Sequence, residues 1–385
     1  MLAIIAPGQG SQTPGMLASW LEDIDAKDLL KQWSDAIDLD LIHLGTTADA
    51  EEIKETANAQ PLIVAAGLLA ARALSADGKF ACVAGHSVGE ITAAVVAGVI
   101  TPLDAMKLVR ARGIEMAKAA SVTPAGMAAV LGGEREVVLR AITDLGLVAA
   151  NDNGGGQIVA AGDLDALAQL APDGARVRPL AVAGAFHTSY MQPAVARMKS
   201  LASSVTVHDP RTRVISNRDG AVVHSGRALL DRMVDQIANP VRWDLCMETL
   251  SELGVTAVIE MPPAGTLVGL IKRALPNVET LALKTPDDIP AALDLIGRHG
   301  FASALDNQPT WRMIVAPFAG YFSGAGVEVG THLEAGSIIG TVSNKRESAE
   351  LKSTHAGTLI EIIVEEGDPV APGQPIARLH PEGQN

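Results

Sequence analysis

The strongest constraint on the fold is an alternation of short apolar runs with helical patterns over about the first 295 residues. Short buried strands are predicted at Ala3–Ala6, Phe80–Ala84 and Thr256–Glu260, the last of them as the final strand of the main sheet. Leu62–Leu74 and Ile91–Val99 have the composition of buried helices rich in small and apolar residues. Strands that alternate with helices in this way are typical of α/β domains.

A second group of predicted strands lies in the middle of this region. Its members are short apolar runs bounded by glycine, proline and polar residues, and they are Gly126–Leu131, Leu147–Ala150, Gln157–Ala161 and Val177–Val182. They predict a smaller α+β subdomain inserted into the main α/β domain.

The character of the sequence changes near Asp306–Thr310, and from Met313 onward it consists of short β runs and glycine turns. An internal repeat occurs here with a spacing of 37 residues, for example 357 − 320. The matched pairs are Ala319-Gly320 with Ala356-Gly357, Gly330 with Gly367, Gly336 with Gly373, and Ile339 with Ile376. Two similar β units of this size predict a small β barrel with pseudo-twofold symmetry.

Composition and charge argue against several classes of protein. The chain has 30 basic and 44 acidic residues, and its net charge of −14 argues against a general nucleic-acid or anionic-membrane binder. Two cysteines are too few for a disulfide framework and fit a reducing cytosol. The N-terminus lacks the basic start of a secretion signal, and the longest apolar stretch, Pro61–Ala71, is shorter than a bilayer span.

The segment Gly85–Gly89 has the pattern G-x-S-x-G, with a predicted strand before it and a predicted helix after it. In this context a sharp strand-to-helix turn exposes the hydroxyl of Ser87 as a nucleophile. The N–H of Val88, at the helix N-terminus, points toward a developing oxyanion. Gln9, in the turn after the first strand, is either a plain turn residue or the second oxyanion donor.

A serine hydroxyl needs a base to become a useful nucleophile. His187, which follows an apolar run and Phe186, is the candidate among the nine histidines. His86 adjoins Ser87, but the side chains of neighbours at such a turn diverge. The histidines and cysteines show no short spacing typical of a zinc site.

Arg112 is the third informative residue. Thr101 as N-cap and Pro102 at the first position begin a helix, on which Arg112 shares a face with apolar residues. A buried guanidinium without a partner is strongly destabilising. Arg112 therefore requires an anion, which is either an internal carboxylate or the carboxylate of a substrate.

Taken together, these motifs resemble the family of malonyl-CoA:acyl carrier protein transacylases over roughly Met1–Ile296. The residues that carry the resemblance occur in the family's order along the chain. They are Pro-Gly-Gln-Gly-Ser-Gln (7–12), Gln60-Pro61, Gly-His-Ser-Val-Gly-Glu (85–90), Arg112-Gly113 with Met116, Pro124–Met127, Asn151 with Gln157, Ala-Phe-His (185–187), Ser216-Asn217, Gln236 with Asn239–Val241 and Trp243, and Pro263 with Gly265.

The resemblance implies an α/β-hydrolase-like domain at 1–123 and 183–300, with a ferredoxin-like subdomain at 124–182. It implies that Ser87 is the acylated nucleophile and His187 its base, and that Arg112 binds the malonyl carboxylate. The Gln9 and Val88 N–H groups become the oxyanion donors, and a backbone carbonyl near Gln236 orients the histidine in place of an acid.

Three further residues are implied to lie at the substrate. Gln60 and Asn151 are placed near the site by the resemblance, without a defined role. Phe186, directly before the histidine, crowds the α-carbon of the acyl group, a pattern that accompanies malonyl rather than methylmalonyl in related acyltransferases.

The C-terminal segment Ile314–Leu379 resembles the biotinyl/lipoyl carrier fold, within a predicted domain at 312–385 after a linker at 301–311. Counting back from Gly357 places Arg346 at the position of the modified lysine, with Lys345 one residue away, and the flanking methionines of the carrier motif are absent. We expect a domain without a cofactor, used for docking, dimerisation or stability. Biotin or lipoyl on Lys345 is the alternative.

The sequence therefore predicts a cytoplasmic enzyme that moves malonyl from malonyl-CoA to holo acyl carrier protein for fatty-acid biosynthesis. Neither nucleic acid nor a membrane is an expected partner. The alternative is a serine hydrolase or thioesterase, which shares Ser87 and His187 but does not need Arg112. An inactive binding module is a third hypothesis, and the presence of all three residues argues against it.

Overall fold

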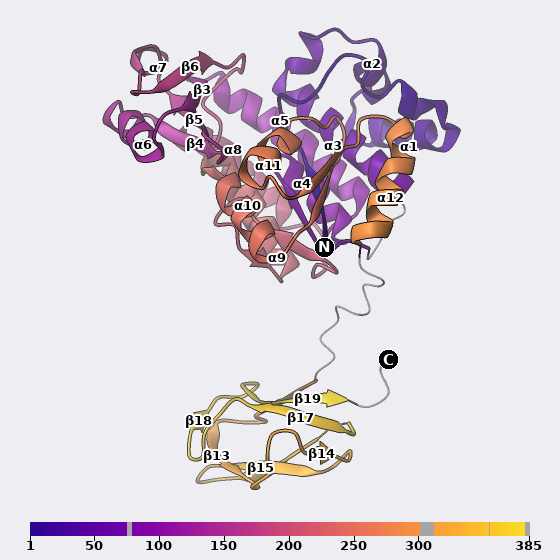
Figure 1. Cartoon of the computed structure of the whole chain (residues 1–385), viewed down its shortest axis with the longest axis vertical. Coiled ribbons are helices and arrows are strands. Elements are labelled where there is room, and N and C mark those ends of the chain that lie inside the picture. Colours follow the sequence, from indigo (N-terminus) through magenta and orange to yellow (C-terminus); the bar gives the residue numbers. More distant parts are fainter. Residues whose placement is uncertain (75–78, 301–311, 354, 382–385) are drawn as a thin grey trace. The chain divides into compact units, whose positions relative to one another are not determined.

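The computed structural model describes residues 1–74, 79–300, 312–353 and 355–381 (Figure 1). The chain divides into two compact units, Met1–Ala304 and Leu305–Asn385. The first unit is α/β and the second is all-β, which confirms the predicted fold class. The predicted linker at 301–311 lies outside the described residues.

A six-stranded sheet forms the centre of the first unit, in the order β11-β10-β1-β2-β7-β8. All neighbours are parallel except β7 and β8. The strands are β1 (Leu2–Ala6), β2 (Cys82–Gly85), β7 (Arg213–Ile215), β8 (Val222–Val223), β10 (Ala257–Glu260) and β11 (Glu279–Ala282). The prediction that Thr256–Glu260 is the final strand was wrong, because β11 follows it at the edge. Edge strand β11 is partly exposed and lacks the apolar run of a buried strand.

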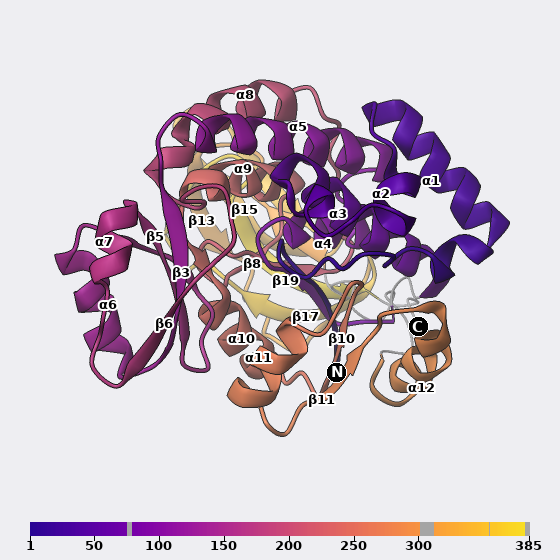
Figure 2. The same ribbon diagram turned by 90° about the horizontal axis from the view of Figure 1, so that it is seen from above.

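Alternate residues of the strands enter two separate cores. Ile4 and Val83 face a large core with helices on one side of the sheet, whereas Ile5 and Ala84 face a second core with α10 and α11. Figure 2 shows α10 and α11 on one side of β10, with α3, α4 and α5 on the other. The helices of both layers are α1 (Ile24–Ile37), α2 (Leu41–Thr46), α3 (Thr56–Leu74), α4 (Gly89–Val96), α5 (Pro102–Ala120), α8 (Gln192–Ala202), α9 (Gly226–Asp235), α10 (Trp243–Glu252), α11 (Leu267–Ala274) and α12 (Ile289–His299).

Helix α3 begins six residues before its predicted start at Leu62 and contains Pro61. A proline inside a helix removes the hydrogen bond to the carbonyl four residues earlier, which here belongs to Ala57. Arg110 of α5 donates to that carbonyl at 2.9 Å, so the interruption is satisfied. Among the described helices α3 is long and apolar enough to cross a bilayer, but 72% of its apolar window is buried, as in a core helix.

Helix α5 begins as predicted. The hydroxyl of Thr101 accepts a hydrogen bond from the N–H of Asp104 at 3.1 Å, and Pro102 occupies the first turn. The apolar face of α5 packs into the large core and carries Arg112 with it.

The inserted subdomain has its own sheet, in the order β6-β3-β5-β4-β9, with α6 and α7 packed against it (Figure 2). Its fifth strand comes from residues outside 124–182 and runs parallel to β4. The elements are β3 (Gly126–Gly132), α6 (Arg135–Asp144), β4 (Val148–Asp152), β5 (Gln157–Gly162), α7 (Leu164–Gln169), β6 (Ala175–Pro179) and β9 (Val241–Arg242).

The second unit is a barrel of two four-stranded antiparallel sheets around an apolar core. The matched glycines of the repeat, Gly330 with Gly367 and Gly336 with Gly373, all have φ between 76° and 94°. Only glycine adopts these angles without strain, which explains why both halves of the repeat have glycine at these positions. The strands are β12 (Arg312–Val315), β13 (Gly320–Gly324), β14 (His332–Leu333), β15 (Ile338–Ser343), β16 (Ser348–Lys352), β17 (Gly357–Ile362), β18 (Pro369–Val370) and β19 (Pro375–Pro381).

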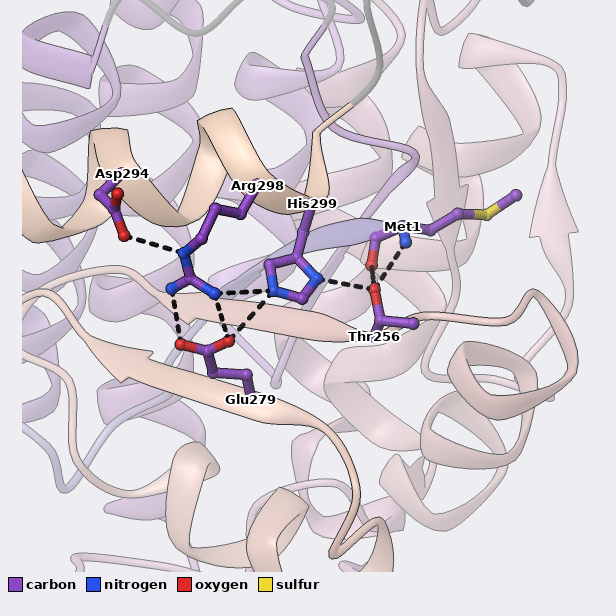
Figure 3. Close-up of polar contacts among 6 residues, drawn as sticks. All are labelled: Met1, Thr256, Glu279, Asp294, Arg298 and His299. Atoms are coloured by element: carbon purple, nitrogen blue, oxygen red, sulfur yellow. Dashed lines mark hydrogen bonds and ion pairs between the residues drawn. The ribbon is translucent and has the colours of Figure 1, made fainter.

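A polar network joins the last helix of the first unit to the start of the chain (Figure 3). Arg298 of α12 donates to both carboxylate oxygens of Glu279 in β11, each at 2.7 Å. His299 lies 3.0 Å from Glu279 and 2.9 Å from the hydroxyl of Thr256, which accepts from the Met1 amine at 2.7 Å. These charges are exposed, so the network positions α12 more than it stabilises the fold.

The turn between β2 and α4 passes directly over β1. A Cβ atom at Gly89 would overlap the carbonyl of Ala6, and one at Gly85 would overlap the backbone of Gly89. Only hydrogen atoms fit at these two positions. The glycines of the G-x-S-x-G pattern therefore set how closely α4 approaches the sheet.

We expect Gly89→Ala to lower the free energy of unfolding of the first unit by about 1–3 kcal/mol, because the clash is with backbone and cannot be relieved by a rotamer change. Gly269→Ala in α11 is the control, since its Cβ meets nothing within 4 Å, and it should stabilise by about 0.5–1 kcal/mol. Denaturant unfolding followed by the fluorescence of buried tryptophans tests both. An unchanged midpoint for Gly89→Ala would contradict this packing.

Candidate active site

Ser87 lies at the turn between β2 and α4 in a left-handed conformation, with φ of 53°. This conformation is unfavourable for a residue with a side chain, by about 1–3 kcal/mol. The side chain of Asn217 holds the turn in place: it accepts from the Ser87 N–H at 2.8 Å and donates to the Gly85 carbonyl at 2.6 Å. Ser87 is therefore presented on a braced turn of the kind that the G-x-S-x-G pattern predicts.

The structure brings Ser87 and His187 together. The hydroxyl oxygen of Ser87 is 2.7 Å from Nε2 of His187, and Nδ1 of His187 is 2.8 Å from the backbone carbonyl of Gln236. A carbonyl only accepts hydrogen bonds, so Nδ1 must carry the proton. The lone pair of Nε2 then faces the Ser87 hydroxyl, as a general base requires.

The surroundings of His187 keep it neutral. Burial, followed by the positive charge of Arg112, lowers the pKa of His187 to about 3. An imidazole with a lowered pKa remains unprotonated at neutral pH and is available to accept a proton. The orienting group is an uncharged carbonyl, so no acid stands in the place that a serine protease gives to aspartate.

Arg112 is 3% exposed and lies beside the reacting pair. Its guanidinium donates to Oε1 of Gln60 at 2.7 Å, to Oε1 of Gln236 at 3.0 Å and to the Ser87 hydroxyl at 3.3 Å. Within the described ranges no carboxylate forms an ion pair with it, so the internal ion pair left open by the sequence is absent. Burial lowers the pKa of Arg112 to about 10, which leaves it charged at neutral pH.

Two backbone N–H groups that the resemblance assigns to the oxyanion have no hydrogen-bond acceptor among the described residues. They belong to Val88, just before α4, and to Gln9, just after β1. The Gln9 side chain lies 3.4 Å from the amide nitrogen of Gln60. Both N–H groups are therefore free to bind an oxyanion.

Within the described ranges, the side chains of Phe186, Asn151 and His86 form no hydrogen bond with Ser87 or His187. Phe186 is buried directly before His187 and contributes to the large core. Asn151 is buried in β4, where it pairs with Val241 of β9. His86 points away from Ser87, with Nε2 2.8 Å from Asn153 and its ring against Trp243.

Two buried polar residues that the sequence analysis named only within family motifs, and not as site residues, brace the site. Asn217 holds the serine turn, and Glu90 of α4 accepts hydrogen bonds from the Asn217 N–H and the Gln236 side chain, both at 2.6 Å. Burial raises the pKa of Glu90 to about 8. The available signal for Glu90 was a single acidic residue directly before the apolar helix predicted at Ile91–Val99.

Comparison with known proteins relates both units to described families. The acyl transferase domain family matches residues 4–290, and the family described as biotin-requiring enzyme matches residues 313–379. The malonyl CoA-acyl carrier protein transacylase of Mycobacterium tuberculosis is 53% identical over 302 residues, covering 77% of this chain and 100% of that protein. The Escherichia coli K12 protein of the same name is 33% identical over 305 residues, covering 76% and 99%.

Solved structures show the same relationship. The crystal structure of MCAT from Mycobacterium tuberculosis matches with a TM-score of 0.74 and 53% identity, covering 76% of this chain and 99% of that one. A malonyl-transacylase solved in complex with its type II PKS acyl-carrier protein matches with a TM-score of 0.71 and 30% identity, covering 76% and 99%. The chain therefore belongs to the malonyl-CoA acyl carrier protein transacylase family and carries in addition a C-terminal biotinyl/lipoyl-type domain.

Proposed function

We propose that Ser87 takes the malonyl group from malonyl-CoA and that holo acyl carrier protein then removes it. The observation that carries this proposal is the buried charge of Arg112, unpaired among the described residues and 3.3 Å from the Ser87 hydroxyl. A malonyl thioester has a reactive carbonyl at one end and a carboxylate at the other. The pair of Ser87 and Arg112 matches these two ends.

In the first half-reaction the Ser87 oxygen bonds to the thioester carbon while Nε2 of His187 takes the hydroxyl proton. The negative charge on the carbonyl oxygen is stabilised by the N–H groups of Val88 and Gln9. The carbon–sulfur bond then breaks, and the proton on His187 passes to the departing CoA sulfur. The products are free CoA and a malonyl ester on Ser87.

In the second half-reaction the phosphopantetheine thiol of acyl carrier protein attacks the ester carbon. His187 takes the thiol proton and returns it to the Ser87 oxygen as the ester bond breaks. Malonyl leaves as a thioester of the carrier protein, and the enzyme regains its free hydroxyl. The complex between a related malonyl-transacylase and its acyl-carrier protein supports this choice of acceptor.

Arg112 serves substrate selection in this scheme. Its guanidinium is held by the neutral oxygens of Gln60 and Gln236, which orient it without neutralising it. A malonyl carboxylate can therefore form a charge-assisted contact with Arg112. We assign Phe186 the smaller role of crowding the α-carbon of the acyl group, and Asn151 a place near the substrate.

We further propose that the enzyme works in the cytoplasm, in fatty-acid biosynthesis. Cys82 and Cys246 are buried and form no disulfide, and burial raises the pKa of Cys82 to about 12. Buried thiols of this kind are unreactive, and a protein without disulfides is compatible with a reducing compartment.

In the C-terminal barrel, the position expected to carry a modified lysine holds Arg346. Asn344 and Glu347 close the turn between β15 and β16, so that Lys345 and Arg346 occupy its centre, both exposed. Arg346 stands at the lysine position that the spacing to Gly357 indicates, and a guanidinium does not form the amide that attaches biotin or lipoyl. We propose that the domain is unmodified and that malonyl transfer needs no cofactor.

The first prediction from the proposed function concerns the covalent intermediate. Incubation with malonyl-CoA should add one malonyl group at Ser87, and holo acyl carrier protein should remove it, because the ester is sheltered from water but open to the carrier thiol. Intact mass spectrometry with peptide mapping measures both steps, and Ser87→Ala should show no adduct. Rapid loss of the adduct to water without the carrier would indicate a thioesterase, and the absence of any adduct a binding module.

The second prediction concerns selectivity. Arg112→Ala removes a charge-assisted contact of about 2–5 kcal/mol, so kcat/KM for malonyl-CoA should fall by at least about 25-fold while acetyl loading improves relative to malonyl. Arg110→Ala is the matched control: it removes an arginine from the same helix that donates to Ala57 instead. Its malonyl-to-acetyl ratio should equal that of the parent. An equal ratio in Arg112→Ala would refute the carboxylate role.

The third prediction concerns the barrel. Protein produced in a host that biotinylates and lipoylates its own proteins should have the mass of the unmodified chain, because the lysine position holds arginine. Tryptic mapping of the β15–β16 turn gives the same information for Lys345 alone. An added biotin or lipoyl mass on that peptide would overturn the assignment.

A further inference from the structure

Glu90 carries a buried carboxyl group that the reaction scheme above does not use. It is the second residue of α4 and is 1% exposed, among the apolar residues Ile91, Ala93 and Ala94. Placing a carboxyl group in such surroundings is unfavourable unless its oxygens are hydrogen-bonded. Its partners therefore indicate why the position is acidic.

Each oxygen of Glu90 accepts from a different part of the site. Oε1 accepts from the backbone N–H of Asn217, the residue that braces the serine turn. Oε2 accepts from the amide nitrogen of Gln236 at 2.6 Å, the shortest contact made by that side chain. Glu90 thus joins the Ser87 turn to the residue that contacts both Arg112 and His187.

The Gln236 amide has a donor end and an acceptor end, and only one orientation suits the site. Its nitrogen faces three acceptors: Glu90 at 2.6 Å, Asn217 Oδ1 at 3.1 Å and the Ser87 carbonyl at 3.3 Å. Its oxygen is thereby turned to the Arg112 guanidinium at 3.0 Å. A flipped amide would place N–H groups against the guanidinium, leaving buried donors unsatisfied at about 1–3 kcal/mol each.

We propose that Glu90 is a positioning residue: by binding the Gln236 amide nitrogen it directs the amide oxygen to Arg112 and so aims the guanidinium at the substrate carboxylate. This inference rests on the proposed malonyl transfer. Glu90 touches neither the reacting atoms nor Arg112 through a hydrogen bond. Its hydrogen bonds reach Arg112 only by way of Gln236, and when ionised its charge also acts on Arg112 through space.

Glu90→Gln is the informative substitution. The new amide can offer its oxygen to the Asn217 N–H, and its NH₂ group then faces Gln236 as a donor. That arrangement favours the flipped Gln236, which turns an NH₂ group toward Arg112. We expect the malonyl-to-acetyl ratio of kcat/KM to fall about tenfold, mainly through a higher KM for malonyl-CoA, at a pH above the pKa of Glu90.

A double-mutant cycle tests the route through Gln236. Gln236→Ala removes the side-chain amide but keeps the backbone carbonyl that holds His187. If Glu90 acts through this amide, Glu90→Gln should cause no further fall in the ratio once Gln236→Ala is present. The same tenfold fall in both backgrounds would overturn the proposal.

Two controls separate positioning from folding. Glu260→Gln alters another buried carboxylate, which accepts from the N–H groups of Gly265, Leu267 and Val268, and it should leave the ratio unchanged. If Glu90→Gln does not fold, Glu90→Asp retains the charge on a shorter side chain and should lower the ratio by a smaller factor. A folded Glu90 variant with the parental ratio overturns the proposal, whereas a parent that loads no malonyl overturns the proposed function instead.

Discussion

The site depends on a charge that the protein buries without neutralising. Arg112 enters the interior on the apolar face of α5, and its partners among the described residues are the neutral oxygens of Gln60, Gln236 and Ser87. A guanidinium in this position is unfavourable until an anion arrives. An unpaired positive charge is a physical basis for preferring an acyl group with a carboxylate. Together with burial, which is the larger cause, this charge lowers the pKa of the neighbouring His187.

The parallel sheet makes this arrangement possible. Ser87 follows β2, and Asn217 follows the neighbouring strand β7, so parallel order brings the two together at the carboxyl ends of the strands. His187 and Gln236 come from connections far along the chain. The backbone carbonyl of Gln236 orients His187 by a hydrogen bond, so no acid is needed beside the imidazole. The charge of Arg112 is therefore not offset by a carboxylate next to His187.

Much of this could be predicted from local sequence. The turn at Ser87, the cap at Thr101 and the repeat marked by Gly330 and Gly367 each have a local physical cause that their residue types reveal. Edge strand β11 and the two-residue strand β9 could not be predicted, because neither has an apolar run. Glu90 and Asn217 were missed as site residues, because a polar residue gives no sign of its partners until the fold buries it.

The sequence by itself determined the classes of both units, the nucleophilic turn, and the need of Arg112 for an anion, since each follows from residue type and short-range spacing. Only the tertiary structure showed that the hydrogen-bond partners of Arg112 among the described residues are neutral oxygens. Only the tertiary structure also brought Ser87 and His187, 100 residues apart, to 2.7 Å. Such contacts depend on how strands and connections pack, which local sequence does not encode residue by residue.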